Sequence, residues 1–362
     1  MARTRVLLAP DSFKRSLTSA EVAAALAEGL RSHPAPPEVR SRPLADGGEG
    51  SVDAAVAAGF SPEEVEVPGP TGAPVRAAVA WRGDTVVVEV ANTCGPTLLP
   101  GGRPDPLGAS SQGVGLALRQ VLTRRPRRVV LALGGSASTD GGLGMLEALG
   151  AVDDGGRLDV GPAVASLGGV DLVLATDVDN PLLGPRGAAP VFAPQKGADG
   201  ATVDLLARRL DALVSRAESA VTGARVLAAA PGAGAAGGTA WAGLLLGGRV
   251  VPGAGWFLDL LDLGGVLDGC DLVVTGEGRL DEQTPGGKLP WAVAGRARAR
   301  GVPVELVVGR CDLAEEVWRA AGIRAVHVLG DLTDRDPSRD SALTARLLAA
   351  VGRSIADRLS LP

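Results

Sequence analysis

The stretch VVLALGGSASTDGG (residues 129–142) decides the fold prediction, because it joins a short apolar run to a glycine-rich loop that carries an acid. Two further stretches repeat this arrangement, LADGGEG (44–50) and LVVTGEGRLD (272–281). Glycine lets backbone N–H groups approach an anion closely, and a helix that begins after such a loop directs its positive end to the same point. The acids supply hard oxygen ligands for Mg²⁺. Loops that hold phosphate and Mg²⁺ together indicate phosphoryl transfer.

Strand-like and helix-like segments alternate outward from these loops. Residues 6–9 predict a strand, and TSAE (18–21) predicts a helix start through a capping box, with Val22, Leu26 and Leu30 at helical spacing. Further strands are expected at 129–133, 172–175, 270–274, 304–308 and 325–329, and further helices after 110–111, near 202–220 and over 341–358. Strands that alternate with helices predict an α/β protein with a mainly parallel sheet.

The two ends of the chain have a similar pattern, whereas the middle is richer in glycine, proline and irregular runs. Residues 65–100 alternate apolar residues with proline and glycine, which favours an antiparallel or edge region. We therefore expect one discontinuous domain, residues 1–62 and 265–362, with a second domain, residues 63–264, inserted between its two parts.

Composition excludes several classes of function. The chain has 362 residues, 46% hydrophobic but only 2% aromatic with no tyrosine, so its cores must be built from Ala, Val and Leu. Aromatic platforms for single-stranded nucleic acid are not expected. A net charge of −5 with intermixed signs also argues against a nucleic-acid partner.

The three cysteines, Cys94, Cys270 and Cys311, are far apart and show no CxxC spacing, which indicates reduced thiols and a cytoplasmic protein. The apolar run at 6–10 is too short for a signal-peptide core. The one uncharged stretch of membrane length, 226–248, contains Pro231 and many glycines, so we expect a buried loop and helix start, and no membrane partner.

Several polar residues follow predicted strands, where α/β sheets bind ligands. Asp11 and Lys14 follow the first strand; Asp11 would ligate Mg²⁺ or accept a hydroxyl proton and Lys14 would contact phosphate, while a loop acid and a solvated lysine is the alternative. Asp177, Asp179 and Asn180 form either a metal or hydroxyl clamp or an Asx-turn that leads into Pro.

Two lysines lie beside glycine, Lys196 in PQKG (194–197) and Lys288 in GGK (286–288), and either suits a phosphate. Neither fits a P-loop, since Glu282 and Leu289 stand at the positions that the motif gives to Gly and to Ser or Thr. Histidine is nearly absent, and we expect His33 and His327 to be structural. A carboxylate would then serve as the base, which phosphoryl transfer tolerates.

Seven ordered strings resemble the bacterial glycerate kinases of the two-domain type. They are APDSFK (9–14), ADGGEG (45–50), GGSASTDGGLGML (134–146), DVDNPLLGP (177–185), PQKGA (194–198), PGAGAAGG (231–238) and TGEGRLDEQT (275–284). The resemblance implies ATP- and Mg²⁺-dependent phosphorylation of D-glycerate, usually to 2-phosphoglycerate. It also implies a Rossmann-like domain paired with a second α/β domain, an active site in the cleft between them, and glycerate and ATP as partners of a monomer or homodimer.

On this resemblance, the site residues fall into four groups. The catalytic set is Asp11, Lys14, Asp46, Asp140, Glu277 and Asp281. The substrate-binding set is Arg279, Lys288, Asp177, Asp179, Asn180 and Lys196, with the planar fork of Arg279 on the glycerate carboxylate. The nucleotide-binding set is Gly134, Gly135, Ser136, Gly232, Gly234 and Gly237, and the metal set is Asp46, Glu49, Asp140 and Glu277.

The sequence departs from the family pattern at a few positions. Arg15 stands where a glycine usually follows the lysine, Ser138 and Thr139 replace the common Thr-Asn, and Pro285-Gly286 replace the usual Leu-His. All the acids and lysines named above remain. The alternatives are a kinase of another small hydroxy acid and a non-catalytic sensor that binds glycerate or nucleotide.

Overall fold

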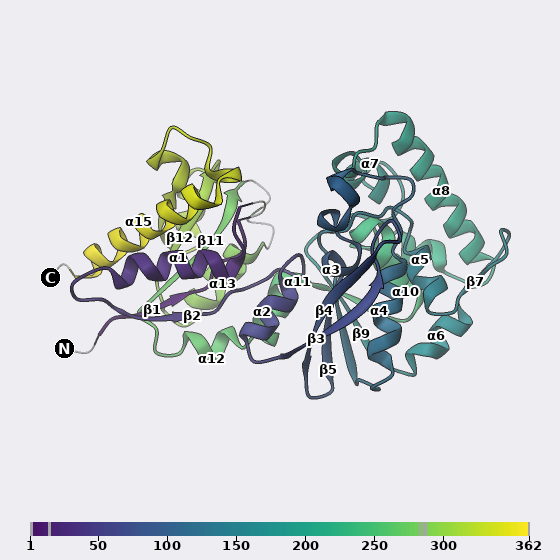
Figure 1. The fold of residues 1–362 in the computed structure, drawn as a ribbon, viewed down its shortest axis with the longest axis horizontal. Coiled ribbons are helices and arrows are strands. Elements are labelled where there is room, and N and C mark those ends of the chain that lie inside the picture. The colour runs from purple at the N-terminus through teal and green to yellow at the C-terminus, as the bar shows by residue number, and fades with distance from the viewer. Residues whose placement is uncertain (1–2, 14–15, 282–283, 285–287, 361–362) are drawn as a thin grey trace. The chain divides into compact units, whose positions relative to one another are not determined.

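The computed structural model describes residues 3–13, 16–281, 284 and 288–360, which form two compact α/β units (Figure 1). Unit 1 comprises Met1–Asp46, Asp53–Ala58 and Ala254–Pro362, and unit 2 comprises Gly47–Val52 and Gly59–Gly253. The chain therefore leaves and re-enters unit 1, so that both of its ends belong to the same unit.

Unit 1 is built on a five-stranded sheet in the order β13-β12-β11-β1-β2, in which every pair is parallel. Its strands are β1 (Arg5–Leu8), β2 (Glu38–Ser41), β11 (Leu272–Leu280), β12 (Val304–Cys311) and β13 (Ile323–Val328). Because all five run in the same direction, their carboxyl ends lie at one edge of the sheet. The predicted strands at 6–9, 270–274, 304–308 and 325–329 are confirmed.

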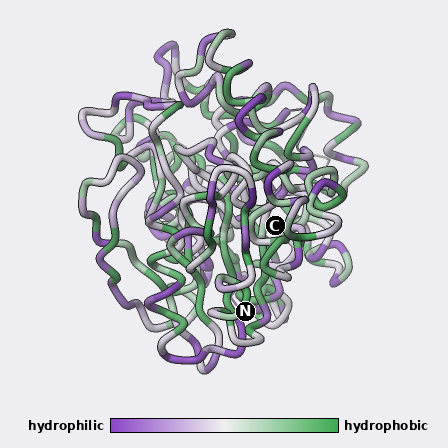
Figure 2. Tube along the Cα trace, turned by 90° about the vertical axis from the view of Figure 1, so that its right-hand side faces the viewer, coloured by the Kyte–Doolittle hydropathy of each residue, from purple (hydrophilic) through white to green (hydrophobic). Residues whose placement is uncertain are grey.

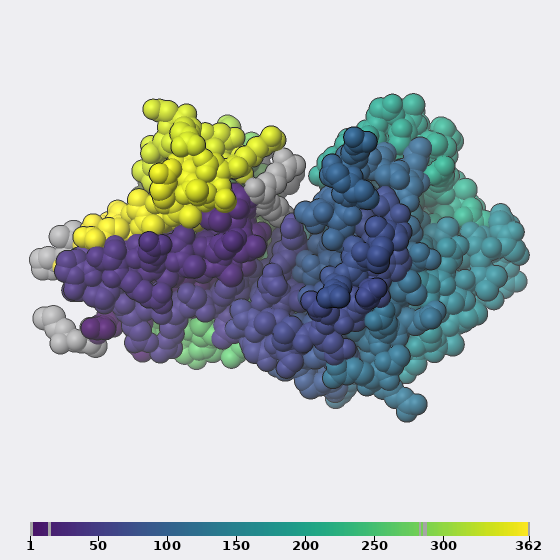
Figure 3. Space-filling view, in the orientation of Figure 1, coloured from purple at the N-terminus to yellow at the C-terminus, as the bar shows by residue number. Residues whose placement is uncertain are grey.

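Helices α1 (Ser19–Arg31) and α15 (Ser341–Leu359) pack side by side, which brings the purple and yellow ends of the chain together (Figures 1 and 3). The predicted capping box is present: Thr18 Oγ1 accepts from the Glu21 N–H, and the Glu21 carboxylate accepts from the Thr18 N–H. The unit also contains α11 (Gly253–Leu260), α12 (Leu263–Leu267), α13 (Leu289–Arg298) and α14 (Glu315–Ala320).

One prediction in unit 1 is wrong. Residues 275–280 were expected to form a glycine-rich loop, but they continue strand β11 and pair with β12 from Val273 to Leu280. The non-local pairing explains this, since a Cβ on Gly276 would lie 1.8 Å from the carbonyl oxygen of Val307, and glycine alone permits so close an approach. Side chains alternate along a strand, so Glu277 and Arg279 share a face.

A buried acid ties α15 to the outer strands of this sheet. Glu305 on β12 is 1% exposed and accepts hydrogen bonds from Arg324, His327 and Arg358. Burial alone would raise the pKa of Glu305, but the hydrogen bonds from His327 and Arg324 and the charge of Arg358 outweigh it and lower that pKa to about 2. His327 therefore has the structural role expected from the sequence.

Unit 2 is built on a six-stranded sheet in the order β10-β9-β6-β5-β4-β3. Its strands are β3 (Ser61–Pro68), β4 (Pro74–Arg82), β5 (Thr85–Glu89), β6 (Arg128–Ala132), β9 (Asp171–Thr176) and β10 (Arg249–Pro252), and a separate hairpin consists of β7 (Val152–Asp153) and β8 (Leu158–Asp159). Strands β3, β4 and β5 pair antiparallel at one side, and β5, β6, β9 and β10 pair parallel. The antiparallel edge predicted for the 65–100 region is confirmed.

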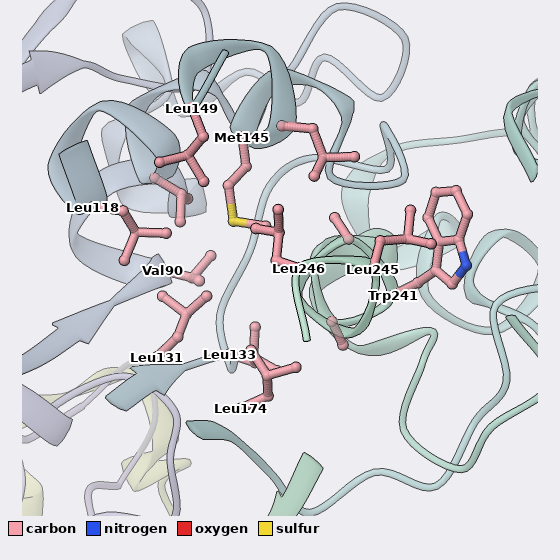
Figure 4. Packing of buried hydrophobic residues seen from close by; sticks show 14 of the residues in the cluster. Val90, Leu118, Leu131, Leu133, Met145, Leu149, Leu174, Trp241, Leu245 and Leu246 are labelled. Atoms are coloured by element: carbon pink, nitrogen blue, oxygen red, sulfur yellow. The ribbon is translucent and has the colours of Figure 1, made fainter. Parts of the chain in front are cut away.

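The core of unit 2 consists mainly of Ala, Val and Leu, as composition predicted. Figure 4 shows Met145 among Leu118, Leu149, Leu246 and other aliphatic side chains, with Trp241 at one side. The helices around this core are α3 (Val90–Cys94), α4 (Gln112–Leu122), α5 (Leu143–Ala148), α6 (Gly161–Leu167), α7 (Ala188–Phe192), α8 (Gly200–Glu218), α9 (Ala224–Ala228) and α10 (Thr239–Leu245), while α2 (Ser51–Ala57) spans the boundary of the two units.

Hydrophobic stretches, in green, and hydrophilic stretches, in purple, alternate along the trace of the chain (Figure 2). Within the described residues, every helix is too short or too polar to span a membrane, and residues 226–248 form α9, a loop and α10. The three cysteines are free thiols, and burial raises the pKa of Cys94 and of Cys270.

The contact of α1 with α15 predicts that replacing a helix glycine by alanine destabilises the protein, whereas such a change usually stabilises a helix. A Cβ on Gly29 would lie 1.9 Å from the carbonyl oxygen of Ala349. Gly29→Ala should therefore destabilise the protein by about 1–3 kcal/mol through overpacking, despite the helix propensity of alanine. The matched control is Gly295→Ala in α13, where a Cβ meets nothing within 4 Å, and it should gain up to about 1 kcal/mol. Urea unfolding measures both, and equal effects would contradict the packing argument.

Candidate active site

The carboxyl edge of the unit 1 sheet carries several of the predicted site residues. Asp11 follows β1, is 7% exposed, and its N–H donates to the Gly276 carbonyl at 2.9 Å. Thr275 Oγ1 donates to the Ala9 carbonyl at 2.7 Å, so the segment after β1 is joined to β11. Asp46 is half-buried and is the last residue of the first unit 1 segment, Met1–Asp46, a few residues after β2. Lys14, which was predicted beside Asp11, lies outside the described residues.

Glu277 near the end of β11 and three residues that follow the strand form a connected polar cluster. Thr284 Oγ1 lies 3.0 Å from Glu277 Oε1 and 3.5 Å from Asp281 Oδ1, and it also accepts from the Asp281 N–H. Lys288 Nζ lies 3.0 Å from Asp281 Oδ1. Two carboxylates therefore approach one hydroxyl, with an ammonium group beside them. The sequence predicted the two acids and the lysine but not the linking Thr284.

Arg279, predicted to grip a carboxylate, lies beside a second arginine. Its Nε is 2.6 Å from Asp312 Oδ2, and Arg310 Nε is 2.7 Å from Asp312 Oδ1. The two arginines are register partners on β11 and β12. Hydrogen bonds from Arg310 and Arg279 lower the pKa of Asp312. The sequence analysis missed Arg310 and Asp312, because only the strand register brings them to Arg279.

In unit 2, the first glycine-rich loop is held at the carboxyl edge of the sheet by Glu89, the last residue of β5. The buried Glu89 carboxylate accepts from the Gly50 N–H at 3.1 Å and the Val52 N–H at 3.0 Å. The Gly134 N–H donates to the Gly47 carbonyl at 3.0 Å, so loops 47–50 and 134–142 lie against each other. Glu49 of this loop is exposed. The sequence analysis did not name Glu89, although its place as an acid at the end of an apolar strand could have marked it as a candidate.

Asp140 holds the second glycine-rich loop in shape. One carboxylate oxygen accepts from the Ser111 N–H at 2.8 Å, the Ser111 hydroxyl at 2.7 Å and the Gly144 N–H at 3.3 Å, and the other accepts from the Gly142 N–H at 3.0 Å. The carboxylate predicted as a metal ligand thus links this loop by hydrogen bonds to Ser111, the residue before α4. Ser111 was not predicted to take part.

Lys196 lies against the same loop. Its Nζ donates to Ser136 Oγ at 2.8 Å and to the Ser138 carbonyl. Burial lowers the pKa of Lys196 to about 8, although the nearby Cys94 and Asp140 act in the opposite direction. A lysine that titrates so close to neutrality changes charge within the working range of an enzyme.

Strand β9 ends at Thr176, so it does not carry the side chains after it to one face. Asp177 is exposed, Asp179 forms an exposed ion pair with Arg186 at 3.0 Å, and the Asn180 amide donates to the Arg186 carbonyl at 2.8 Å. Both bonds lead to Arg186, six and seven residues further along the chain, and neither is the bond of an Asx-turn, in which a side-chain oxygen accepts a nearby backbone N–H. The roles of Asp177, Asp179 and Asn180 stay predictions.

The glycines at 232–237 lie close to neighbouring residues of unit 2. A Cβ on Gly234 would lie 2.3 Å from the Pro181 carbonyl oxygen, one on Gly237 would lie 2.1 Å from the Ser138 carbonyl oxygen, and one on Gly232 would lie 2.9 Å from Val250. Loop 231–238 thus packs against residues 138–141 and 180–182 of unit 2. Gly135 has φ +78°, which favours glycine.

Comparison with known proteins decides the family. Residues 6–360 match the model of the glycerate kinase family. The chain belongs to the glycerate kinase family. It is 39% identical to the glycerate kinase of Bacillus subtilis and 36% identical to the glycerate 2-kinase of Escherichia coli, and each alignment covers 89% of both chains.

A solved structure described as a glycerate kinase 2 from Salmonella typhimurium superposes with a TM-score of 0.76 at 32% identity, over 99% of this chain and 98% of that one. The α/β class with mainly parallel sheets is therefore confirmed. Membership of a kinase family likewise confirms the predicted enzyme class, a phosphotransferase that uses a nucleotide.

The hydrogen bonds of Asp140 predict that replacing this residue lowers the stability of the protein, which its place in a family motif does not by itself predict. Asp140→Asn places an amide N–H₂ against N–H donors, so we expect a loss of about 2 kcal/mol, seen as a lower thermal midpoint. The control is Glu49→Gln on the exposed loop 47–50, which should leave the midpoint unchanged. A stable Asp140→Asn protein that had lost only its response to Mg²⁺ would indicate a ligating role instead.

The pKa of Lys196 predicts that the catalytic efficiency of the protein falls at alkaline pH. Lys196 is charged below about pH 8 and neutral above it, so kcat/KM for ATP should fall as the pH rises through about 8. In Lys196→Arg the guanidinium stays charged, and the fall should move to higher pH. Initial rates between pH 6 and 10 measure both profiles. An unchanged midpoint in the variant would assign the titration to another group.

Proposed function

We propose that this protein transfers the γ-phosphoryl group of ATP to D-glycerate in a Mg²⁺-dependent reaction that yields 2-phosphoglycerate. The observation that carries the proposal is the hydrogen-bonded set of Glu277, Thr284, Asp281 and Lys288 at the carboxyl edge of a parallel sheet. It unites carboxylates with an ammonium group, the groups that a phosphoryl transfer requires. Family membership supports the choice of glycerate, and the relative named glycerate 2-kinase supports the position phosphorylated.

The acceptor hydroxyl of glycerate forms a new O–P bond as the bond between the γ-phosphorus and the bridging oxygen of ADP breaks. Its proton passes to a carboxylate, for which Asp11, Asp46 and Glu277 are the candidates. A histidine base is disfavoured by placement, since His327 is bound to Glu305 and His33 lies beside Asp357. Lys288 would offset the negative charge of the phosphates, and the same role stays a prediction for Lys196 and Lys14.

The residues that would hold the substrates follow from the same chemistry. The guanidinium of Arg279, which lies beside Arg310, would bind the glycerate carboxylate. To do so, it would replace its hydrogen bond to Asp312 with one to the substrate. Asp177 would contact a glycerate hydroxyl, with Asp179 and Asn180 shaping the turn beside it. Gly134, Gly135 and Ser136 would supply N–H and hydroxyl donors to the nucleotide phosphates, and the loop with Gly232, Gly234 and Gly237 would support them.

A magnesium site of the kind found in kinases fits these residues. Within the described ranges, His, Cys, Asp and Glu form no cluster of three or more that would hold a metal. Mg²⁺ in such sites is usually held by one or two carboxylates together with the substrate phosphates. Glu277 and Asp281, which approach one hydroxyl at 3.0 and 3.5 Å, suit that role. When bound there, Mg²⁺ would neutralise phosphate charge.

Of the predicted metal set, Asp46 and Glu277 belong to unit 1, and Glu49 and Asp140 belong to unit 2. We retain Asp46 and Glu277 as candidate metal ligands. Asp140 already accepts hydrogen bonds from Ser111, Gly142 and Gly144, so we assign it a positioning role.

The ion pair of Asp281 with Lys288 makes the proposal testable. Both side chains are 30% exposed, so breaking the pair costs little stability. Asp281→Asn should lower kcat at least tenfold, about 1.4 kcal/mol of barrier, with an unchanged thermal midpoint. The matched control is Asp357→Asn, which breaks the exposed pair with Arg353 on α15 and should leave turnover unchanged.

The assay measures ADP release from ATP and D-glycerate, with and without Mg²⁺, and couples the product to enolase alone. Mg²⁺-dependent turnover with an enolase signal supports the proposal, and turnover without that signal indicates 3-phosphoglycerate. Turnover only with another hydroxy acid changes the substrate, and binding of glycerate without any turnover supports the sensor alternative.

A further inference from the structure

Ser136, in the second glycine-rich loop, forms a hydrogen-bonded pair with a lysine. Lys196 Nζ lies 2.8 Å from Ser136 Oγ. Within the described residues this is the one hydrogen bond of the Ser136 hydroxyl, so Lys196 Nζ is the atom placed to take its proton. A hydroxyl within hydrogen-bond reach of a base is the arrangement of an activated nucleophile, and a serine paired with a lysine is one of its forms.

Lys196 is held in a way that favours its neutral form. In the described part of the chain it forms no ion pair, and its second acceptor is the carbonyl oxygen of Ser138. Burial lowers the pKa of Lys196 to about 8 against the opposing effects of Cys94 and Asp140, the titratable groups that act on it. A neutral Lys196 can donate one N–H to the Ser138 carbonyl while its lone pair accepts the Ser136 proton.

The backbone beside Ser136 is arranged to bind an anion. Gly135 has φ +78°, and successive N–H groups at such a left-handed residue form a concave anion site. The N–H groups on either side, of Gly134 and Ala137, are bonded to backbone carbonyl groups at 3.0 and 2.7 Å. Those of Gly135 and Ser136 donate to no atom of the described residues. Two N–H groups next to the hydroxyl therefore remain available to a phosphate.

Ser136 is also the most accessible of the three hydroxyls in this loop. Ser138 and Thr139 are 0% and 2% exposed, whereas Ser136 is half-buried and follows the exposed Gly135. An accessible hydroxyl, an amine beside it and two N–H donors thus come together at one residue. These are the parts that a nucleophile needs in order to attack phosphorus.

We propose that Ser136 accepts the γ-phosphoryl group of ATP when no other acceptor is bound, with Lys196 as the base. Ser136 Oγ forms a new bond to the γ-phosphorus, and the bond from that phosphorus to the bridging oxygen breaks, so that its electron pair leaves with ADP. The hydroxyl proton passes to Lys196 Nζ, which becomes an ammonium group beside a phosphoserine of about −2 charge. This inference rests on the proposed function, which places the nucleotide phosphates at this loop.

Mass spectrometry of the full chain tests the inference after incubation with ATP and Mg²⁺ in the absence of glycerate. The intact mass measures the added phosphoryl group, and fragment spectra locate it, with Ser136 expected. Ser136→Ala should lose the modification. The matched control, Ser138→Ala, should keep it, because the Ser138 side chain is 0% exposed and the carbonyl oxygen that Lys196 contacts is retained.

A second variant, Lys196→Arg, separates the role of a base from that of a positive charge. Arginine keeps the charge but stays protonated, so the rate of Ser136 phosphorylation at saturating ATP should fall at least about tenfold. An unchanged rate in Lys196→Arg would show that Lys196 acts through its charge, and would overturn its assignment as the base.

The outcomes separate this inference from the proposed function. Turnover of ATP with D-glycerate, without any phosphate on Ser136 when glycerate is absent, overturns the inference and leaves the proposed function standing. Phosphate on Ser136 without turnover of glycerate supports the inference, while the proposed substrate fails. Phosphate found only on other residues, or unchanged labelling of Ser136→Ala, also overturns it. Should a variant lower the thermal midpoint, the fragment spectra of the wild-type protein decide.

Discussion

The buried carboxylate of Glu89 is the interaction on which the arrangement of unit 2 depends. A polar group inside a protein must be hydrogen-bonded, and the Glu89 side chain meets this requirement by accepting hydrogen bonds from the N–H groups of Gly50 and Val52. The result is that loop 47–50, which directly follows the unit 1 segment ending at Asp46, is fixed to the sheet of unit 2. It then meets Gly134, where a Cβ would lie 2.4 Å from the Cα of Gly48.

Much of the fold could be predicted because its signals are local. The capping box at Thr18 and Glu21, the apolar strands and the helical spacing of Val22, Leu26 and Leu30 depend on residues a few positions apart, and the structure confirms them. The strand at 275–280 could not be predicted in the same way. Its glycines are typical of a loop, and only pairing with β12, about 30 residues further along the chain, makes them a strand.

The site shows the same division between local and distant information. The charged residues of the glycine-rich stretches were predicted as a group, but their individual roles depend on partners far along the chain, such as Ser111 for Asp140 and Asp312 for Arg279. Glycine also serves two purposes that a sequence does not separate. Gly234 and Gly237 permit close packing of loops, while glycines at an anion site permit close approach to phosphate. The predicted roles and the domain boundaries at 62–63 and 264–265 stay predictions.

The chemistry of the two units differs in a way that bears on the proton acceptor. In unit 2, Glu89 and Asp140 are occupied in holding backbone N–H groups, and the glycine-rich loops present N–H groups, hydroxyls and Lys196. The N–H groups, the hydroxyls and Lys196 suit the neutralisation of phosphates. Among them, only Lys196 in its neutral form readily accepts a proton. In unit 1, Glu277 and Asp281 share the hydroxyl of Thr284. The carboxylate that receives the glycerate proton is therefore best sought in unit 1, where an acid can act without releasing a loop from its sheet.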